Sequence, residues 1–73
     1  MENREVVLKV LKKYGVSTAK QVVVLARRDF NVELTGPKVS GTLRPLVAKG
    51  QIATSKDINN TTVYWIANNG GEL

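Results

Sequence analysis

Apolar residues recur every three to four positions along the first two thirds of the chain, and this period predicts three helices. The helices are expected at residues 2–14, 18–30 and 35–50. The apolar stripe of the first helix consists of Val6, Val7, Val10, Leu11 and Tyr14. Gly15 follows the stripe and is expected to end this helix, because glycine readily adopts the left-handed conformation found after helix ends.

The second helix is predicted from a capping residue and from two faces of opposite character. Ser17 can cap it, because a serine hydroxyl accepts an amide hydrogen of the first turn, and Val16 ahead of it can pair as a short strand. The inner face is expected to carry Ala19, Val22, Val23, Ala26 and Phe30. The outer face would carry Lys20, Gln21, Val24, Arg27 and Arg28. Three consecutive valines also suit a strand, but the outward polar residues favour a helix, and Leu34 should close the core beside the next turn.

Residues 35–50, TGPKVSGTLRPLVAKG, have the most distinctive pattern in the chain. Thr35 is a good N-cap, and Gly50 is a typical helix stop. The apolar face is Val39, Leu43, Leu46 and Val47. The opposite face is small, with Gly41, Pro45 and Ala48 flanked by Lys38, Ser40, Thr42 and Arg44. Pro45 has no amide hydrogen to donate, so we expect a modest bend there, or else a break that leaves residues 46–49 as a separate turn.

The last part of the chain predicts a hairpin. Residues 51–56 and 61–67 are rich in Thr, Val, Tyr, Trp and Ile, and the turn chemistry of residues 57–60 separates them. Alternation puts Val63 and Trp65 on one face and Tyr64 and Ile66 on the other, and the pattern leaves open which pair packs on the helices. Residues 1–67 are thus expected to form one domain, and residues 68–73 a flexible tail.

Composition narrows the range of functions. The 73 residues suit a single small domain, and the lack of cysteine and histidine argues against a metal site and suits a reducing cytoplasm. We therefore expect a cytoplasmic protein, associated with the nucleoid if its source is bacterial or viral. No apolar run reaches about 18 residues, so no membrane partner is expected. The scattered acids and the lack of a glycine-rich phosphate loop argue against an enzyme, a cofactor or a small-molecule substrate.

The net charge points to an anionic partner. Eleven Lys and Arg residues against six acids give +5, a balance that most often indicates nucleic acid, and residues 34–56 contain four cations and no acid. Arg44 is the best candidate to read a base, because its planar fork can bind guanine O6 and N7 together. The full set of candidate DNA contacts is Lys20, Lys38, Ser40, Gly41, Thr42, Arg44, Lys49, Lys56, Asn59, Asn60 and Thr61.

The order of the elements resembles that of winged helix-turn-helix domains over residues 2–67. The resemblance is carried by the Ser17 cap with its helix, by TGPKVSGTLRPLVAKGQI and by the closing strand TTVYWIA. It implies an α+β fold of three helices followed by a two-stranded hairpin, with the third helix in the DNA major groove and residues 56–62 as the wing loop. It also implies that five residues face bases or phosphates: Lys38, Ser40, Gly41, Thr42 and Arg44.

A weaker likeness is to the Z-DNA-binding members of that superfamily. Their third helix carries an Asn and a Tyr, and their wing has a pair of prolines beside a Trp. The matching positions here are Ser40, Arg44, Thr61–Thr62 and Tyr64, of which only Tyr64 keeps an aromatic character. Left-handed DNA is therefore not the expected ligand.

The expected function is sequence-specific or semi-specific binding of double-stranded DNA by a small transcriptional regulator. A single module reaches few base pairs, so a homodimer is a further expected partner. The alternative is a winged-helix module that binds another protein in a larger assembly. Salt separates the two, because phosphate contacts weaken steeply between 50 and 200 mM salt and a hydrophobic docking surface does not.

Overall fold

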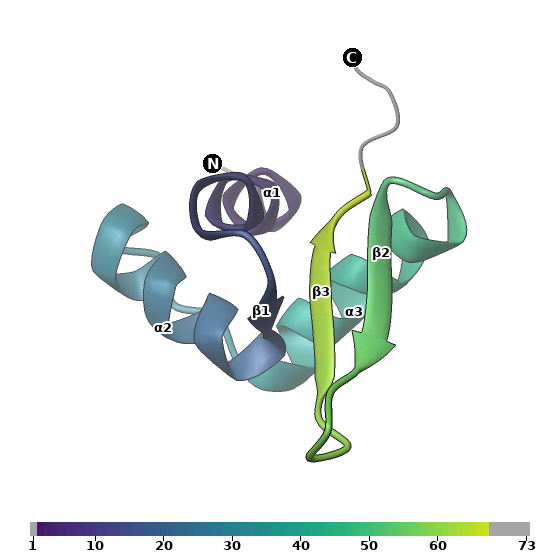
Figure 1. Cartoon of the computed structure of the whole chain (residues 1–73). Helices are drawn as coiled ribbons and strands as arrows, with labels where there is room; N and C mark the ends of the chain where they lie inside the picture. The colour runs from purple at the N-terminus through teal and green to yellow at the C-terminus, as the bar shows by residue number, and fades with distance from the viewer. Residues whose placement is uncertain (1, 68–73) are drawn as a thin grey trace.

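The computed structural model describes residues 2–67 and contains three helices followed by a small antiparallel sheet (Figure 1). Its elements are α1 (Asn3–Tyr14), β1 (Ser17–Thr18), α2 (Ala19–Phe30), α3 (Gly36–Ala48), β2 (Ile52–Lys56) and β3 (Thr62–Ile66). This is the α+β arrangement of a winged helix-turn-helix, so the predicted fold class is confirmed. No helix within the described part is long and apolar enough to cross a membrane. The expected tail, residues 68–73, lies outside the described residues.

The sheet has the strand order β1-β3-β2, and both pairs are antiparallel. Ser17 lies opposite Tyr64, and Ile52 lies opposite Ile66. The short strand expected at Val16 is therefore displaced by one residue, and Val16 itself is 60% exposed. Because β1 immediately precedes α2, its pairing with β3 ties the start of that helix to the hairpin.

The N-cap of α2 is Thr18, and the expected cap at Ser17 is wrong. The Thr18 hydroxyl accepts the N–H of Gln21 at 3.1 Å, and the Thr18 N–H donates to Oε1 of Gln21 at 2.8 Å. This reciprocal pair needs an acceptor side chain three residues after the cap. With Ser17 as the cap, the residue three positions later would be Lys20, whose side chain has no hydrogen-bond acceptor. Ser17 is instead buried in β1, where its hydroxyl donates to the carbonyl of Gly15.

The core lies between the three helices and one face of the sheet. Its buried residues are Val6, Val7, Val10, Leu11, Val22, Ala26, Leu34, Val39, Leu43, Leu46 and Ile52. Tyr64 and Ile66 pack against this core, which resolves the question that the alternation left open, and Trp65 lies on the opposite face beside Ala53. Tyr14 departs from the predicted stripe: it is 37% exposed, and its hydroxyl contacts Asp29 at the surface.

Helix α3 continues through Pro45, so the alternative of a break at that residue is wrong. The Thr35 hydroxyl accepts the N–H of Lys38 at 3.3 Å and begins the helix as expected. Pro45 is exposed, and the helix runs on to Ala48. A proline on the solvent side removes one backbone donor without placing its ring against the core. Gly50 then turns the chain into β2 with a φ of 80°.

Candidate nucleic-acid interface

The solvent face of α3 is low and uncrowded. Gly41, Pro45 and Ala48, here called the outer ridge, are all exposed, whereas Val39 and Leu43 on the opposite side are fully buried. A Cβ atom added at Gly41 would meet no atom within 4 Å. Packing within residues 2–67 therefore does not require a glycine here, although glycine in a helix costs about 0.5–1 kcal/mol relative to alanine.

Arg44 lies on one flank of the outer ridge and has no ion pair with any acid of residues 2–67. The two acids that could have held it are engaged elsewhere. Glu33 pairs with Arg27, with 3.2 Å between Oε2 and Nη1. Asp57 accepts two backbone amides in the wing loop. The Arg44 fork is thus exposed and available to an external acceptor.

The two hydroxyl residues on α3 are less available than the sequence suggested. Ser40 and Thr42 are both only half-exposed. The Thr42 hydroxyl donates to the carbonyl of Lys38 at 2.8 Å, one turn earlier in the same helix. This bond occupies the only donor of Thr42, so its side chain can offer a partner only its acceptor lone pairs.

The wing loop is a hydrogen-bonded turn. The Asp57 N–H donates to the carbonyl of Thr61 at 3.0 Å, and the Asn60 N–H donates to the carbonyl of Asp57 at 2.9 Å. The Asp57 carboxylate also accepts the N–H groups of Asn59 and Thr61, at 2.9 and 3.0 Å. Asn60 is left-handed, with a φ of 63°. The side chains of Asn59, Asn60 and Thr61 are exposed, as a contact surface requires.

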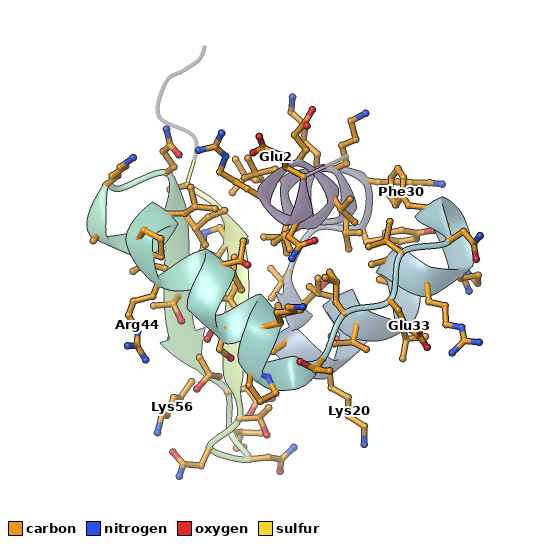
Figure 2. All side chains as sticks on the ribbon, turned by 180° about the vertical axis from the view of Figure 1, so that it is seen from behind. Glu2, Lys20, Phe30, Glu33, Arg44 and Lys56 are labelled. Carbon is orange, nitrogen blue, oxygen red and sulfur yellow. The ribbon has the colours of Figure 1, made fainter. Side chains whose placement is uncertain are left out.

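Three of the five predicted basic contacts come together on one side of the molecule. Figure 2 shows Lys20, Arg44 and Lys56 pointing to the side opposite Glu2 and α1. They come from α2, α3 and the end of β2, and all three are exposed. Because their elements are far apart in sequence, the fold itself creates this group, which we call the cationic face.

Lys38 and Lys49 are exposed but lie on a different flank of α3 from Arg44. At about 100° per residue, both fall on the flank of α3 opposite to Arg44. Lys49 also caps the C-terminal end of the helix, while Lys56 ends β2. A strand of five residues, roughly 16 Å long, separates these two lysines.

A second charged cluster, which the sequence did not reveal, joins the ends of α1 and α2. The Tyr14 hydroxyl donates to the Asp29 carboxylate, and the Lys13 ammonium lies 3.1 Å from the same carboxylate. Nη2 of Arg28 donates to the Tyr14 hydroxyl at 3.1 Å. The hydrogen bond from Tyr14, followed by that from Lys13, lowers the pKa of Asp29. The same carboxylate raises the pKa of Lys13. Only the pairing of the two helices brings these residues together, so no local pattern could have shown the cluster.

The arrangement suits an extended polyanion better than a small ligand. Unpaired cations from three elements lie on one side of the molecule, the outer face of α3 carries little side-chain bulk, and the wing loop presents short polar side chains. Comparisons with models of protein families, with curated proteins and with solved structures each find no match. The geometry of this surface therefore supplies the argument for function.

Proposed function

We propose that this chain binds double-stranded DNA in the manner of a winged helix-turn-helix regulator, with α3 in the major groove and the wing loop on the adjacent backbone. The observation that carries the proposal is the cationic face, where Lys20, Arg44 and Lys56 have no acidic partner among residues 2–67. Cations that lack an internal partner raise the energy of the free protein slightly, and a line of phosphates would relieve this.

The cations have different roles in this proposal. Lys20 near the start of α2 and Lys56 at the end of β2 contact phosphates and set the position of the protein on the duplex. Arg44 reads a base edge, because a guanidinium can donate to both acceptors of guanine. The outer ridge supports this placement, since a helix without bulky outer side chains fits closely into a groove about 12 Å wide.

A single domain of this size covers few base pairs, so we further propose that two copies bind together on DNA. Operators with two half-sites about one helical turn apart would match such a pair. The lack of cysteine in the sequence is compatible with a reducing compartment that contains DNA.

Replacing Arg44 with alanine tests the proposal. With a preferred duplex selected from a random pool, Arg44→Ala should weaken binding about ten- to hundredfold, because one bidentate base contact is worth roughly 1–3 kcal/mol. Binding to unselected duplex should fall less. Fluorescence anisotropy at fixed salt measures both affinities.

The matched control is Arg27→Ala, since Arg27 is also an exposed helical arginine but pairs with Glu33. This variant should bind both duplexes like the wild type. Equal losses on the two duplexes for Arg44→Ala would make Arg44 a phosphate contact and remove its role as a base reader.

One observation favours a second candidate, a module that binds another protein. Trp65 lies on the sheet face turned away from the core, and Figure 1 shows no helix in front of that face. Tryptophan is a frequent anchor in protein interfaces. If no duplex binds at 50 mM salt while a protein partner binds with little dependence on salt, this candidate replaces DNA binding.

A further inference from the structure

The wing loop exposes a large apolar side chain at residue 58, the first of the three residues at the hairpin tip. Ile58 is 98% exposed, more than any other large apolar residue in the described part of the chain. Turns at this position are usually built from Gly, Pro, Asn, Asp or Ser. Residues 2–67 gain no packing from isoleucine at this position, because almost none of its surface is removed from water.

The backbone beneath Ile58 is held in one shape. Asp57 bonds to the backbone of Asn59, Asn60 and Thr61 through both its side chain and its main chain. The result is a three-residue hairpin loop that ends in a left-handed Asn60, a common closed form. The Ile58 side chain therefore projects from the tip of a hairpin whose turn is held by hydrogen bonds.

We propose that Ile58 is an apolar wedge that enters the minor groove of bound duplex DNA and partly unstacks one base step. This inference rests on the DNA binding proposed above and deepens it. Apolar wedges of this kind are used by proteins that kink DNA from the minor groove. Asn59 and Asn60 beside the wedge carry amides that can donate to the acceptors on the groove floor.

The chemistry of the loop favours DNA over a protein pocket. A protein interface needs a contiguous apolar patch, whereas the other exposed large apolar residues, Tyr14, Val16 and Val24, lie outside the hairpin. Lys56, two residues before Ile58, belongs to the cationic face and can hold a phosphate as the tip enters the groove. A single apolar side chain, Ile58, next to the cation Lys56 suits the minor groove of DNA, which is lined by phosphates on both sides.

A wedge makes binding depend on how easily the DNA unstacks. Pyrimidine–purine steps such as TA open easily, whereas A-tracts are stiff and have a narrow minor groove. An alternating A·T duplex contains many TA steps, and an A-tract of the same length contains none. The two duplexes have equal charge and composition, so simple phosphate contacts do not distinguish them.

The experiment compares these two duplexes, each about two helical turns long and containing 2-aminopurine in place of one adenine. The wild type should bind the alternating duplex about fivefold more tightly and increase its 2-aminopurine fluorescence. Ile58→Thr should bind both duplexes equally and leave the fluorescence unchanged. Val24→Thr is the matched control, since Val24 is also exposed and β-branched, and it should behave like the wild type. Both variants should keep the thermal midpoint of the wild type.

Two outcomes would overturn the wedge, and they are distinguishable. If Ile58→Thr keeps both the preference and the fluorescence change, Ile58 does not enter the DNA, although duplex binding stands. If the wild type binds neither duplex at 50 mM salt, the proposed function fails, and the wedge fails with it.

Discussion

Where the ends of α1 and α2 meet, two cations share the carboxylate of Asp29. The cations of the cationic face have no acidic partner among residues 2–67. Lys13 and Arg28 both contact Asp29, whose side chain is only 16% exposed. Arg44 and Lys56 have no carboxylate within 4 Å among residues 2–67. Lys9 and Lys12 of α1 also have no ion pair within the described part of the chain, so the cationic face is distinguished by its place beside α3 and the wing loop as well as by the lack of acidic partners.

The contrast shows that residue type alone does not assign a cation its role. An exposed ion pair usually contributes less than about 1 kcal/mol to the stability of the fold, so a pair such as Arg27–Glu33 adds little. The Asp29 site is different, because a tyrosine hydroxyl and two cations surround one carboxylate. That site links the ends of α1 and α2, whereas the cations of the cationic face make no ion pair among residues 2–67.

The largest effect on DNA binding is expected when three cations of the cationic face are replaced, compared with the loss of three paired cations. The triple variant Lys20→Gln, Arg44→Gln, Lys56→Gln should weaken duplex binding about a hundredfold or more in 50 mM salt. Because Lys20 and Lys56 are the two proposed phosphate contacts, the slope of log K against log salt should also fall by about 1.8. Titrations at several salt concentrations measure both quantities.

The matched triple variant removes the paired cations instead, with Lys13→Gln, Arg27→Gln and Arg28→Gln. It has the same net charge, and it should keep nearly the affinity and slope of the wild type while losing some thermal stability. Equal weakening by the two triple variants would mean that DNA senses only the total charge, and the cationic face would then have no special role.

Much of the fold could be predicted because apolar period and capping chemistry are local. The three helices lie where the pattern placed them, with ends that differ by at most two residues, and the Thr35 cap and the buried Leu34 are confirmed. The cap of α2 was within reach too, since Gln21 three residues after Thr18 marks it. The packing face of β3 was not predictable, because both of its faces carry large apolar residues.

The candidate site was predictable only in part. The excess of cations over acids in residues 34–56 is visible in the sequence, but their arrangement depends on the fold. Lys49 and Lys56 lie at opposite ends of β2. The Thr42 hydroxyl donates to the carbonyl of Lys38 within the same helix. The grouping of Asp29 with Tyr14 needs the packing of two helices, which periodicity alone does not specify.

A smaller effect is expected at the outer ridge, where stability and binding should change in opposite directions. Gly41→Ala should raise the free energy of unfolding by about 0.5–1 kcal/mol, since the added Cβ meets no atom within 4 Å. Gly41→Leu should also fold stably but bind DNA about tenfold more weakly, because its side chain would occupy space needed for close approach. Thermal unfolding and anisotropy measure the two effects.

Val24→Leu is the control for added bulk, because Val24 is also an exposed helical residue but belongs to α2 and not to α3. It should leave DNA binding unchanged. Wild-type affinity for Gly41→Leu would show that the outer ridge does not face the duplex.

The smallest expected effect is a pH dependence of stability that comes from Asp29. Because the hydrogen bond from Tyr14 and the ammonium of Lys13 lower the pKa of Asp29, its ionised form stabilises the folded state. That contribution is fully present above the usual carboxyl pKa of about 4, and it is lost as pH falls through the lowered folded value. Asp29→Asn should therefore reduce the thermal midpoint at neutral pH, and the difference from the wild type should disappear at low pH. Circular dichroism melts from about pH 7 to about pH 2 follow this difference, in which the titration of the other acids cancels.

The DNA affinity of Asp29→Asn at neutral pH should equal that of the wild type. A clear increase in affinity would mean that Lys13 and Arg28, once released from Asp29, also reach the duplex. The two regions would then no longer differ in role.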